Sequence, residues 1–314
     1  MTYNPEIEAL RLRLQAPDAA MRRIALIDLA DLEDPDGLDW LVDSLRNDPS
    51  VEVRTQAASL LEAWEEPEVV EALCAALTDA EVSVREAAAQ SLSVLKTAQA
   101  GELLLPWTEH ADVSVRTAIF RALRELRLDA AAPAALRALA DADPGIRREA
   151  VGVLGWLKHL PALAALAALA SGDADTEVRR AATGALGLAS DECVLPALCQ
   201  ALQDPAWQVR EEAATTLGKV GSVNAGDALI EALTDDYWQV RLRATRSLGR
   251  LRYAPALAAL IQALSHSISN LRKEAALALG ELGDREALTA LRDAAEDADP
   301  EVRKAVRIAL AQLQ

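Results

Sequence analysis

Apolar residues recur along the chain with the spacing of an amphipathic helix, and this pattern itself repeats about every 31 residues. Each copy is marked by an arginine that follows Val, Ile, Leu or Met. The ten arginines are Arg22, Arg54, Arg85, Arg116, Arg147, Arg179, Arg210, Arg241, Arg272 and Arg303. Counted from this arginine, offsets +3, +7 and +10 are small or mostly apolar, which places them on one face of a helix. The chain is therefore predicted to carry ten copies of one helical unit.

A second helix is predicted upstream of each arginine. Segments such as LPALAALAALA and PALAALIQAL have the same periodicity and indicate a helix of roughly ten residues. Prolines separate the segments at Pro35, Pro67, Pro133, Pro161, Pro196 and Pro255. An aspartate lies at offset −6 in seven copies, namely Asp48, Asp79, Asp141, Asp173, Asp204, Asp235 and Asp297. In a turn between two helices its carboxylate can accept backbone N–H groups. Each copy is thus a helical hairpin that buries its apolar face only by stacking on its neighbours.

The composition supports a single helical array. Half of the residues are hydrophobic and only 3% are aromatic, which favours helices over sheets. We expect one array over residues 1–314, with an N-terminal cap at about 1–33 and a C-terminal cap at about 284–314. The last copy has Arg307 at offset +4, where the other copies have smaller or apolar residues. This is typical of an end repeat with a polar outer side, so we expect the array to be complete.

The repeat pattern resembles a known family. The motif D…VRxxAxxxLGxL, seen in DAEVSVREAAAQSLSVL, DPAWQVREEAATTLGKV and DADPEVRKAVRIALAQL, is similar to the HEAT-like repeats of the phycobilisome-lyase (PBS lyase) family. The resemblance covers nearly all of the chain and implies an all-α fold, a right-handed α-solenoid of about ten HEAT-like helical hairpins. It also implies that Asp and Arg, such as Asp204 and Arg210, form a structural ladder between adjacent repeats. Where His110 and His266 replace the aspartate, we expect altered caps rather than a metal site.

The second helix of each hairpin offers a candidate binding surface. Offsets +1, +2, +5 and +9 lie opposite the apolar stripe, and in such solenoids the second helices line the concave surface that usually binds partners. These positions vary strongly from copy to copy. The predicted binding residues are Arg121, Glu149, Gly152, Trp156, Gly184, Glu212, Thr215, Arg243, Arg246 and Arg250.

Two features of this surface each have two interpretations. Gly152, Gly184 and Thr215 leave little side-chain volume, which either opens a notch beside Trp156 or lets helices pack closely. The arginines on RLRATRSLGRLRY suit carboxylates or phosphates of a partner, or they pair with Glu212 and Glu274 of the same chain.

A secondary aromatic edge is formed by Trp207, Tyr237 and Trp238 in DPAWQVR and DDYWQVR. Trp207 and Trp238 are predicted to act as wedges that pack one turn against the next. The alternative is an exposed aromatic pair that contributes to binding.

The charge of the chain limits its partners. The formal net charge is −17, and residues 1–100 carry twenty acidic and eight basic side chains. Nucleic acid and anionic membranes are therefore disfavoured as partners. The three cysteines have no metal-binding spacing, and Cys74 and Cys199 occupy equivalent places in two copies, where small buried hydrophobes are expected. No pattern for nucleophilic catalysis or phosphate binding is present, so we expect neither metal nor cofactor and favour a non-enzymatic role.

The sequence leaves two functional hypotheses. The first is a protein-binding scaffold or adaptor that holds an acidic segment of a partner on the concave face. The alternative, motivated by the resemblance, is a lyase subunit or chaperone that holds a target protein during attachment or maturation of a prosthetic group. The chain has no apolar stretch of membrane-spanning length, and its start, MTYNPEIEAL, is unlike a signal peptide. A cytoplasmic location is expected.

Overall fold

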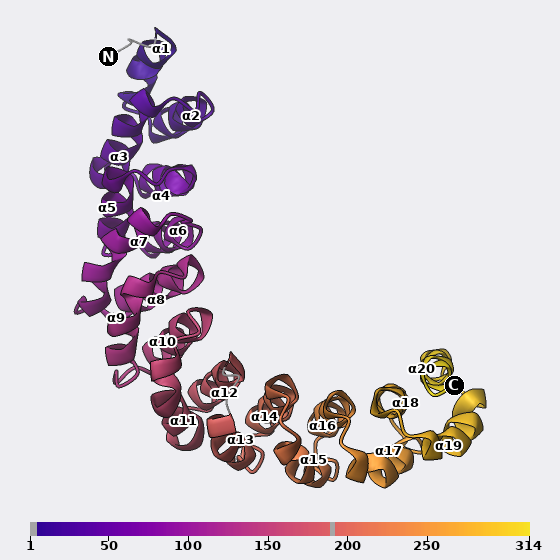
Figure 1. Cartoon of the computed structure of the whole chain (residues 1–314). Coiled ribbons are helices and arrows are strands. Elements are labelled where there is room, and N and C mark those ends of the chain that lie inside the picture. The colour runs from indigo at the N-terminus through magenta and orange to yellow at the C-terminus, as the bar shows by residue number, and fades with distance from the viewer. Residues whose placement is uncertain (1–4, 189–191) are drawn as a thin grey trace. The chain divides into compact units, whose positions relative to one another are not determined.

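The structure is a computed structural model that describes residues 5–188 and 192–314. In these residues all regular elements are helices (Figure 1), so the predicted all-α class is confirmed. Residue contacts divide the chain into two compact units, Met1–Leu157 and Lys158–Gln314, here called unit 1 and unit 2. Residues 1–4 of the predicted N-terminal cap lie outside the described residues. The single array over 1–314 stays a prediction.

Unit 1 consists of helical hairpins in which an odd-numbered helix A is followed by an even-numbered helix B. The helices are α1 (Pro5–Leu14), α2 (Ala19–Ala30), α3 (Leu38–Asn47), α4 (Val51–Leu60), α5 (Pro67–Ala76), α6 (Val82–Leu92), α7 (Ala98–Leu104), α8 (Val113–Leu126), α9 (Ala132–Ala138) and α10 (Pro144–Trp156). Each of the ten predicted arginines lies on a helix B, four residues after the N-cap in most repeats, as Arg116 follows Asp112.

Unit 2 repeats the same hairpin. Its helices are α11 (Leu163–Gly172), α12 (Thr176–Ala185), α13 (Leu195–Ala201), α14 (Trp207–Val220), α15 (Gly226–Ala232), α16 (Trp238–Leu251), α17 (Leu257–Ala263), α18 (Ser269–Leu282), α19 (Leu288–Asp293) and α20 (Pro300–Gln312). Several A helices are shorter than the ten residues predicted, because their first turn is a 3₁₀ helix. The turns before these shorter helices are Asp129–Ala131, Glu192–Val194, Val223–Ala225, Ala254–Ala256 and Arg285–Ala287, whereas Pro35–Gly37 and Leu160–Ala162 precede A helices of ten residues.

The predicted apolar stripe forms the core of each unit. Ala213 and Leu217 on α14 have no exposed surface, and neither do Ala244 and Leu248 at the same offsets on α16. Each helix B packs against its own helix A and, within a unit, against the next helix B. A hairpin alone would leave this stripe in water, so burial of apolar surface between neighbours stabilises the stack.

An arginine–aspartate ladder ties successive repeats together, as the family resemblance implies. Arg210 donates from Nε and Nη2 to the two carboxylate oxygens of Asp235 at 2.6 and 3.0 Å, and from Nη1 to the carbonyl of Asp204 at 2.8 Å. Arg–Asp ion pairs with the same separation of 25 or 26 residues are Arg22–Asp48, Arg54–Asp79, Arg116–Asp141, Arg179–Asp204 and Arg272–Asp297. Each arginine therefore fixes its own turn and the turn of the following repeat.

His110 and His266, which replace the ladder aspartate, keep the hydrogen bond to the backbone of their own turn. His110 accepts the backbone N–H of Asp112 through Nδ1 at 3.1 Å, and His266 accepts that of Ile268 at 3.0 Å. The ladder aspartates accept the equivalent N–H, as Asp235 does from Tyr237. The predicted altered caps are thus present.

Candidate functional site

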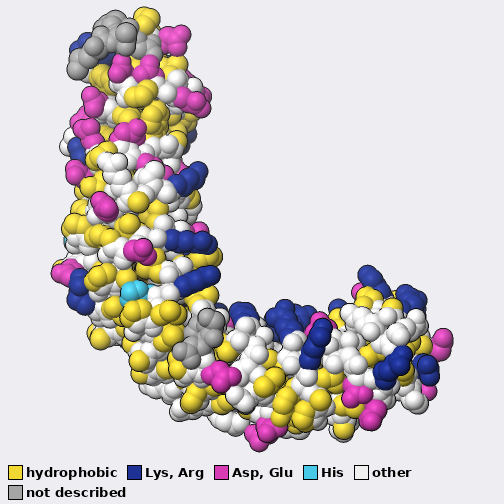
Figure 2. Space-filling view, in the orientation of Figure 1, with side chains coloured by type: hydrophobic (Ala, Val, Ile, Leu, Met, Phe, Trp, Pro, Cys, Tyr) yellow, Lys and Arg dark blue, Asp and Glu magenta, His cyan; other side chains and the backbone are white. Residues whose placement is uncertain are grey.

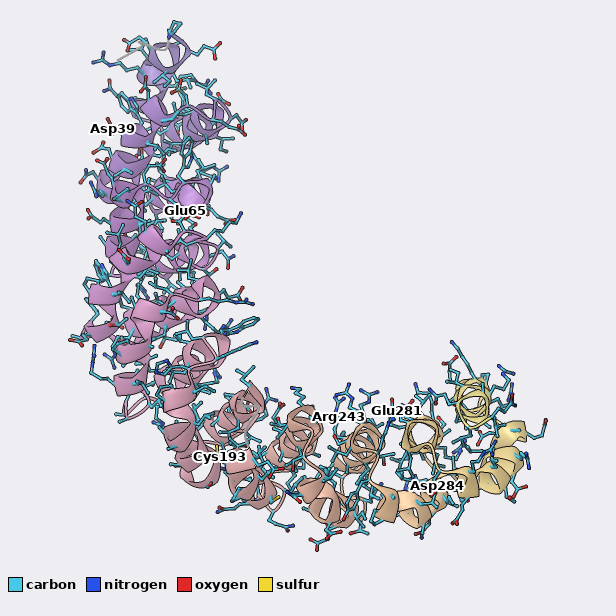
Figure 3. The ribbon with its side chains drawn as sticks, viewed as in Figure 1. Asp39, Glu65, Cys193, Arg243, Glu281 and Asp284 are labelled. Carbon is cyan, nitrogen blue, oxygen red and sulfur yellow. The ribbon has the colours of Figure 1, made fainter. Side chains whose placement is uncertain are left out.

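The ten predicted binding residues belong to both units, and the structure defines each unit by itself. Arg121, Glu149, Gly152 and Trp156 lie in unit 1 on α8 and α10. Gly184, Glu212, Thr215, Arg243, Arg246 and Arg250 lie in unit 2 on α12, α14 and α16. In unit 2, Lys and Arg side chains gather over helices α14 to α18 (Figure 2). Figure 3 shows Arg243 and Glu281 on the same side of this unit.

Glu149 is buried rather than open to a partner. It is only 4% exposed, because Arg124 of the preceding helix B donates from Nη1 to its carboxylate at 3.1 Å. Arg121 approaches the same carboxylate at 3.7 Å, but half of its side chain remains exposed. Glu149, one of the predicted binding residues, is therefore engaged by arginines of its own unit. A charge this well buried is tolerated because cations surround it.

The glycines of the predicted notch are covered by side chains of the adjacent helix B. A Cβ atom on Gly152 would lie 2.8 Å from Cδ of Arg124, and one on Gly184 would lie 3.0 Å from Oε1 of Glu212. Thr215 uses its hydroxyl within its own helix, donating to the carbonyl of Glu211 at 2.9 Å. Close packing, the second interpretation of these residues, agrees with this geometry.

Trp156 is the most exposed aromatic residue among the predicted binding residues. Its side chain is 48% exposed at the end of α10, and the guanidinium carbon of Arg127 lies 5.0 Å from the ring centroid. This cation–π contact covers one face of the ring and leaves the remainder accessible.

The arginines of α16 differ in availability. Arg246 donates from Nε and Nη2 to Glu274 at 2.6 and 3.0 Å, and these bonds raise the pKa of its guanidinium above the usual value. Arg243 donates to Glu211 at 3.0 Å, a residue that is neither of the two internal partners, Glu212 and Glu274, considered from the sequence. Arg250 is exposed and forms no ion pair within the described part of the chain. It is therefore the arginine of this helix that is free to meet a partner.

The aromatic edge combines packing with exposure. Trp207 stacks on Tyr237 of the following repeat, with ring centroids 5.5 Å apart, and Arg210 lies 5.6 Å above Tyr237. Trp207 is thus a wedge between turns, as predicted. Trp238 forms no ring contact in the described residues and is 37% exposed, so the wedge prediction does not extend to it.

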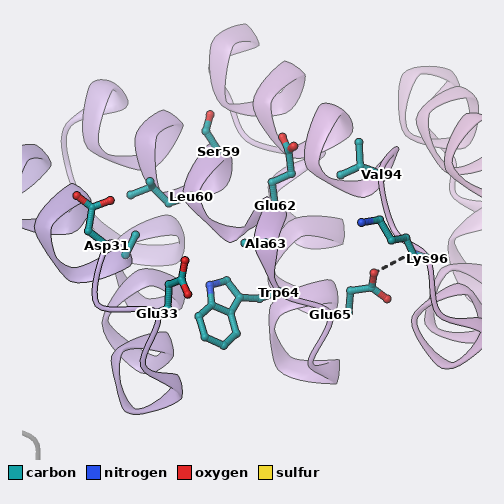
Figure 4. A pocket seen from close by; sticks show the side chains of 11 residues that line it. Asp31, Glu33, Ser59, Leu60, Glu62, Ala63, Trp64, Glu65, Val94 and Lys96 are labelled. Atoms are coloured by element: carbon teal, nitrogen blue, oxygen red, sulfur yellow. Dashed lines mark hydrogen bonds between the residues drawn. The ribbon is translucent and has the colours of Figure 1, made fainter.

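A second surface, which the sequence did not reveal, is an acidic cavity near the C-terminal ends of α2 and α4. It measures about 970 Å³ and contains Trp64 between Glu33 and Glu65 (Figure 4). Asp31, Glu33 and Glu62 make no ion pair in the described residues. Carboxylates at negative helix ends favour a cationic group at this place. The individual acids were visible in the sequence, but their convergence required three repeats to be stacked.

One carboxylate of this cavity has a structural role. Glu65 accepts the backbone N–H groups of Lys96 and Thr97 at 2.8 and 2.9 Å. Partial burial raises the pKa of Glu65, but these hydrogen bonds outweigh it and hold the pKa below its usual value.

The described residues contain no group of three or more His, Cys, Asp or Glu side chains that could hold a metal ion. Burial raises the pKa of the Cys74 thiol to about 12, which suits the predicted packing role and not a nucleophile. No helix among the described residues combines the length and apolarity needed to cross a bilayer.

Comparison with solved structures shows the fold that this chain shares. The Escherichia coli protein YibA has 21% sequence identity and a TM-score of 0.63, over 85% of this chain and 98% of YibA. An engineered protein has 21% identity and a TM-score of 0.54, over 99% of both chains. Kap95p, in a structure concerned with RanGDP, has 14% identity and a TM-score of 0.71, over 99% of this chain but half of Kap95p. These likenesses confirm an α-solenoid.

No curated protein matches the chain. The family model for HEAT repeats, in contrast, matches residues 7–93, 38–112, 101–186, 163–241 and 226–311, which overlap along almost the whole chain. With its stacked hairpins and its arginine–aspartate ladder, the chain belongs to the HEAT-repeat family.

Proposed function

We propose that this chain is a non-enzymatic scaffold that holds a protein partner on the exposed surface of its B helices. The observation that carries the proposal is the contrast between regular and irregular positions on these helices. The positions of the arginine–aspartate ladder and of the apolar stripe carry the same residue types in most repeats, because their side chains contact the neighbouring repeat. Arg121, Trp156 and Arg250 instead place exposed and chemically different groups on the same kind of helix. Exposed arginine and tryptophan are favoured in protein interfaces.

The related folds support a protein partner. Kap95p, which shares this fold, binds RanGDP in one solved structure and forms a complex with Nup1 in another. For this chain we propose an acidic segment of a partner, because free guanidinium groups pair best with carboxylates. The cytoplasmic location stays a prediction.

The test is partner capture from an extract of the source cells, with captured proteins identified by mass spectrometry. Arg250→Glu is expected to reduce capture of the specific partner at least about tenfold without changing the melting temperature, because Arg250 forms no ion pair with any residue that the structure describes. Arg292→Glu reverses an exposed charge on α19, outside the B helices, and is the matched control. Equal capture by the Arg250→Glu protein and the control would contradict the proposal.

Arg246→Glu is not a clean probe of binding. It would place a second carboxylate beside Glu274, which is buried, so we expect a lower melting temperature whether or not Arg246 meets a partner.

The alternative hypothesis, a PBS lyase-like subunit or a chaperone for cofactor maturation, is decided by the same experiment. Of the predicted binding residues that it could use, Arg246 is engaged by Glu274. Absorbance of the native eluate provides the readout. A captured apoprotein or a bound chromophore would favour maturation over a scaffold role.

A further inference from the structure

The joint between α6 and α8 lacks the carboxylate found at the ladder joints described above. The residue 25 positions after Arg85 is His110 instead of aspartate. Arg85 donates from Nη1 to the carbonyls of Asp79 and Ala80 at 2.7 and 2.9 Å, as other ladder arginines do in their own turns. Its Nε and Nη2 atoms, which bind the aspartate elsewhere, make no hydrogen bond in the described residues.

His110 cannot replace the missing acceptor. Its Nδ1 accepts the backbone N–H of Asp112, and its ring stacks on Trp107 with centroids 5.6 Å apart. A neutral imidazole that accepts through Nδ1 carries its proton on Nε2. That second nitrogen is a donor, as the guanidinium of Arg85 is. The ladder position at this joint therefore holds hydrogen-bond donors and no carboxylate.

A groove opens at this joint. The α6 and α8 helices pack more loosely than the other pairs of successive B helices within a unit. Between them lies a cavity of about 360 Å³ that is lined by both Arg85 and Arg121. Leu77 and Val82 supply apolar wall, and the exposed Glu86 is the acid among the lining residues. The side chain of Arg85, whose Nε and Nη2 make no hydrogen bond in the described residues, thus lines an open groove in unit 1.

We infer that this groove is a docking site for an acidic segment of a partner protein. An Asp or Glu side chain of the partner takes the position on Arg85 that a ladder aspartate occupies at other joints, and Arg121 lies on the same groove to pair with a second carboxylate. Bidentate pairing of a carboxylate with a guanidinium is directional and strong. The apolar wall suits an apolar side chain next to the acidic residue of a peptide, whereas a free phosphate has no such group. The negative charge of Glu86 also disfavours a multiply charged anion. This inference rests on the proposed function and names its partner chemistry.

The joint between α16 and α18 provides an internal comparison. His266 replaces aspartate there, and Arg241 keeps only its hydrogen bond from Nη1 to the carbonyl of Asp235 at 2.7 Å. Its Nε is buried without a partner. Because α16 and α18 pack closely, a peptide cannot reach this atom. The same chemical gap therefore exists at both joints, but only the α6–α8 joint is open.

The experiment measures binding of a synthetic peptide to the full chain by isothermal titration calorimetry. The probe is a twelve-residue repeat of Asp-Leu-Glu, and a repeat of Asn-Leu-Gln is its neutral counterpart. His110→Asp is expected to weaken binding at least about tenfold, because its own carboxylate occupies Arg85. The side chain of asparagine has the size of aspartate but no charge. His110→Asn is therefore expected to bind the acidic peptide with an affinity within about threefold of that of the natural chain. His266→Asp, the matched control at the closed joint, is expected to bind unchanged.

Three results would overturn the inference. They are equal affinity of the natural chain and His110→Asp, equal affinity for the acidic and the neutral peptide, and absence of binding at millimolar peptide. Thermal melting shows that each variant is folded. If the acidic peptide does not bind while Arg250-dependent capture of a partner persists, the groove is not the docking site and the scaffold proposal stands. If capture fails as well, both are wrong.

Discussion

At the scale of single residues, the end of helix B shows where the chain accepts backbone strain. Among the described residues, the one at offset +11 adopts the left-handed conformation in six repeats. Only two of these residues are glycine, Gly221 and Gly283, with φ of 77° and 79°. The others are Glu33, Arg127, Lys158 and Arg252, with φ between 49° and 52°. An L-residue pays about 1 kcal/mol or more for this conformation, and glycine does not. Arg127 contacts Trp156, so at least one of these residues has a second role.

Arg252→Gly is therefore expected to stabilise unit 2 by about 1 kcal/mol, since the left-handed conformation becomes free of strain. Gly283→Ala is expected to destabilise it by about the same amount, and no atom crowds the added Cβ, so the backbone is the cause. Chemical denaturation of both variants measures the change. Equal midpoints for both proteins would contradict this account.

At the scale of helices, small residues set how closely neighbouring B helices approach. Glycines at offset +8 face offset +6 of the next helix B. A Cβ on Gly249 would lie 2.6 Å from Cα of Ala278, and one on Gly280 would lie 2.8 Å from Cα of Ala309. At the same offsets, Gly218 faces Ser247. These glycines therefore permit close packing at these joints, because the nearest atoms include the backbone of the next helix.

Gly249→Ala should force α16 and α18 apart and cost about 1–3 kcal/mol, despite the higher helix propensity of alanine. Gly172→Ala is the matched control, because a Cβ at the end of α11 would meet no atom within 4 Å. The control should be neutral or slightly stabilising. Thermal melting of the two variants gives the comparison, and a similar loss in both would show that packing is not responsible.

At the scale of the whole molecule, the ladder aspartates make the stability of the fold depend on pH. Hydrogen bonds and charge from Arg54 hold the pKa of Asp79 below its usual value, and Arg272 does the same for Asp297. A carboxyl with a lowered pKa in the folded state stabilises the fold above its unfolded pKa. That stabilisation is lost as the pH falls through the lower, folded pKa. Ladder aspartates are present in both units, so the effect is not confined to one of them.

The denaturant midpoint is therefore expected to fall steeply as the pH drops below about 4. Asp79→Asn should be less stable than the natural chain at pH 7, and the difference should shrink as the pH falls through the lowered pKa of Asp79, because its carboxylate then becomes protonated. Denaturation curves at each pH test this. A difference that is constant over the whole range would refute the ladder as its source.

Local regularity made much of the fold predictable. Ten arginines at a spacing of 31 or 32 residues indicated the hairpins, the apolar stripe and the solenoid class, because helix periodicity is a property of neighbouring residues. Trp207 as a wedge and the histidine caps followed from the same register. The length of the A helices did not, since a 3₁₀ turn replaces part of the predicted α-helix.

The chemistry of the surface depended on residues one repeat away, and there the tertiary structure decided. Arg246 and Arg250 look alike in the sequence, but Glu274 of the next helix engages only Arg246. Glu149 is buried because Arg124 lies over it. The openness of the groove at Arg85 follows from the packing of α6 on α8, and no single repeat contains that information. Sequence by itself therefore determined the repeating unit, whereas the distance between stacked units determined which charges are paired and which can meet a partner.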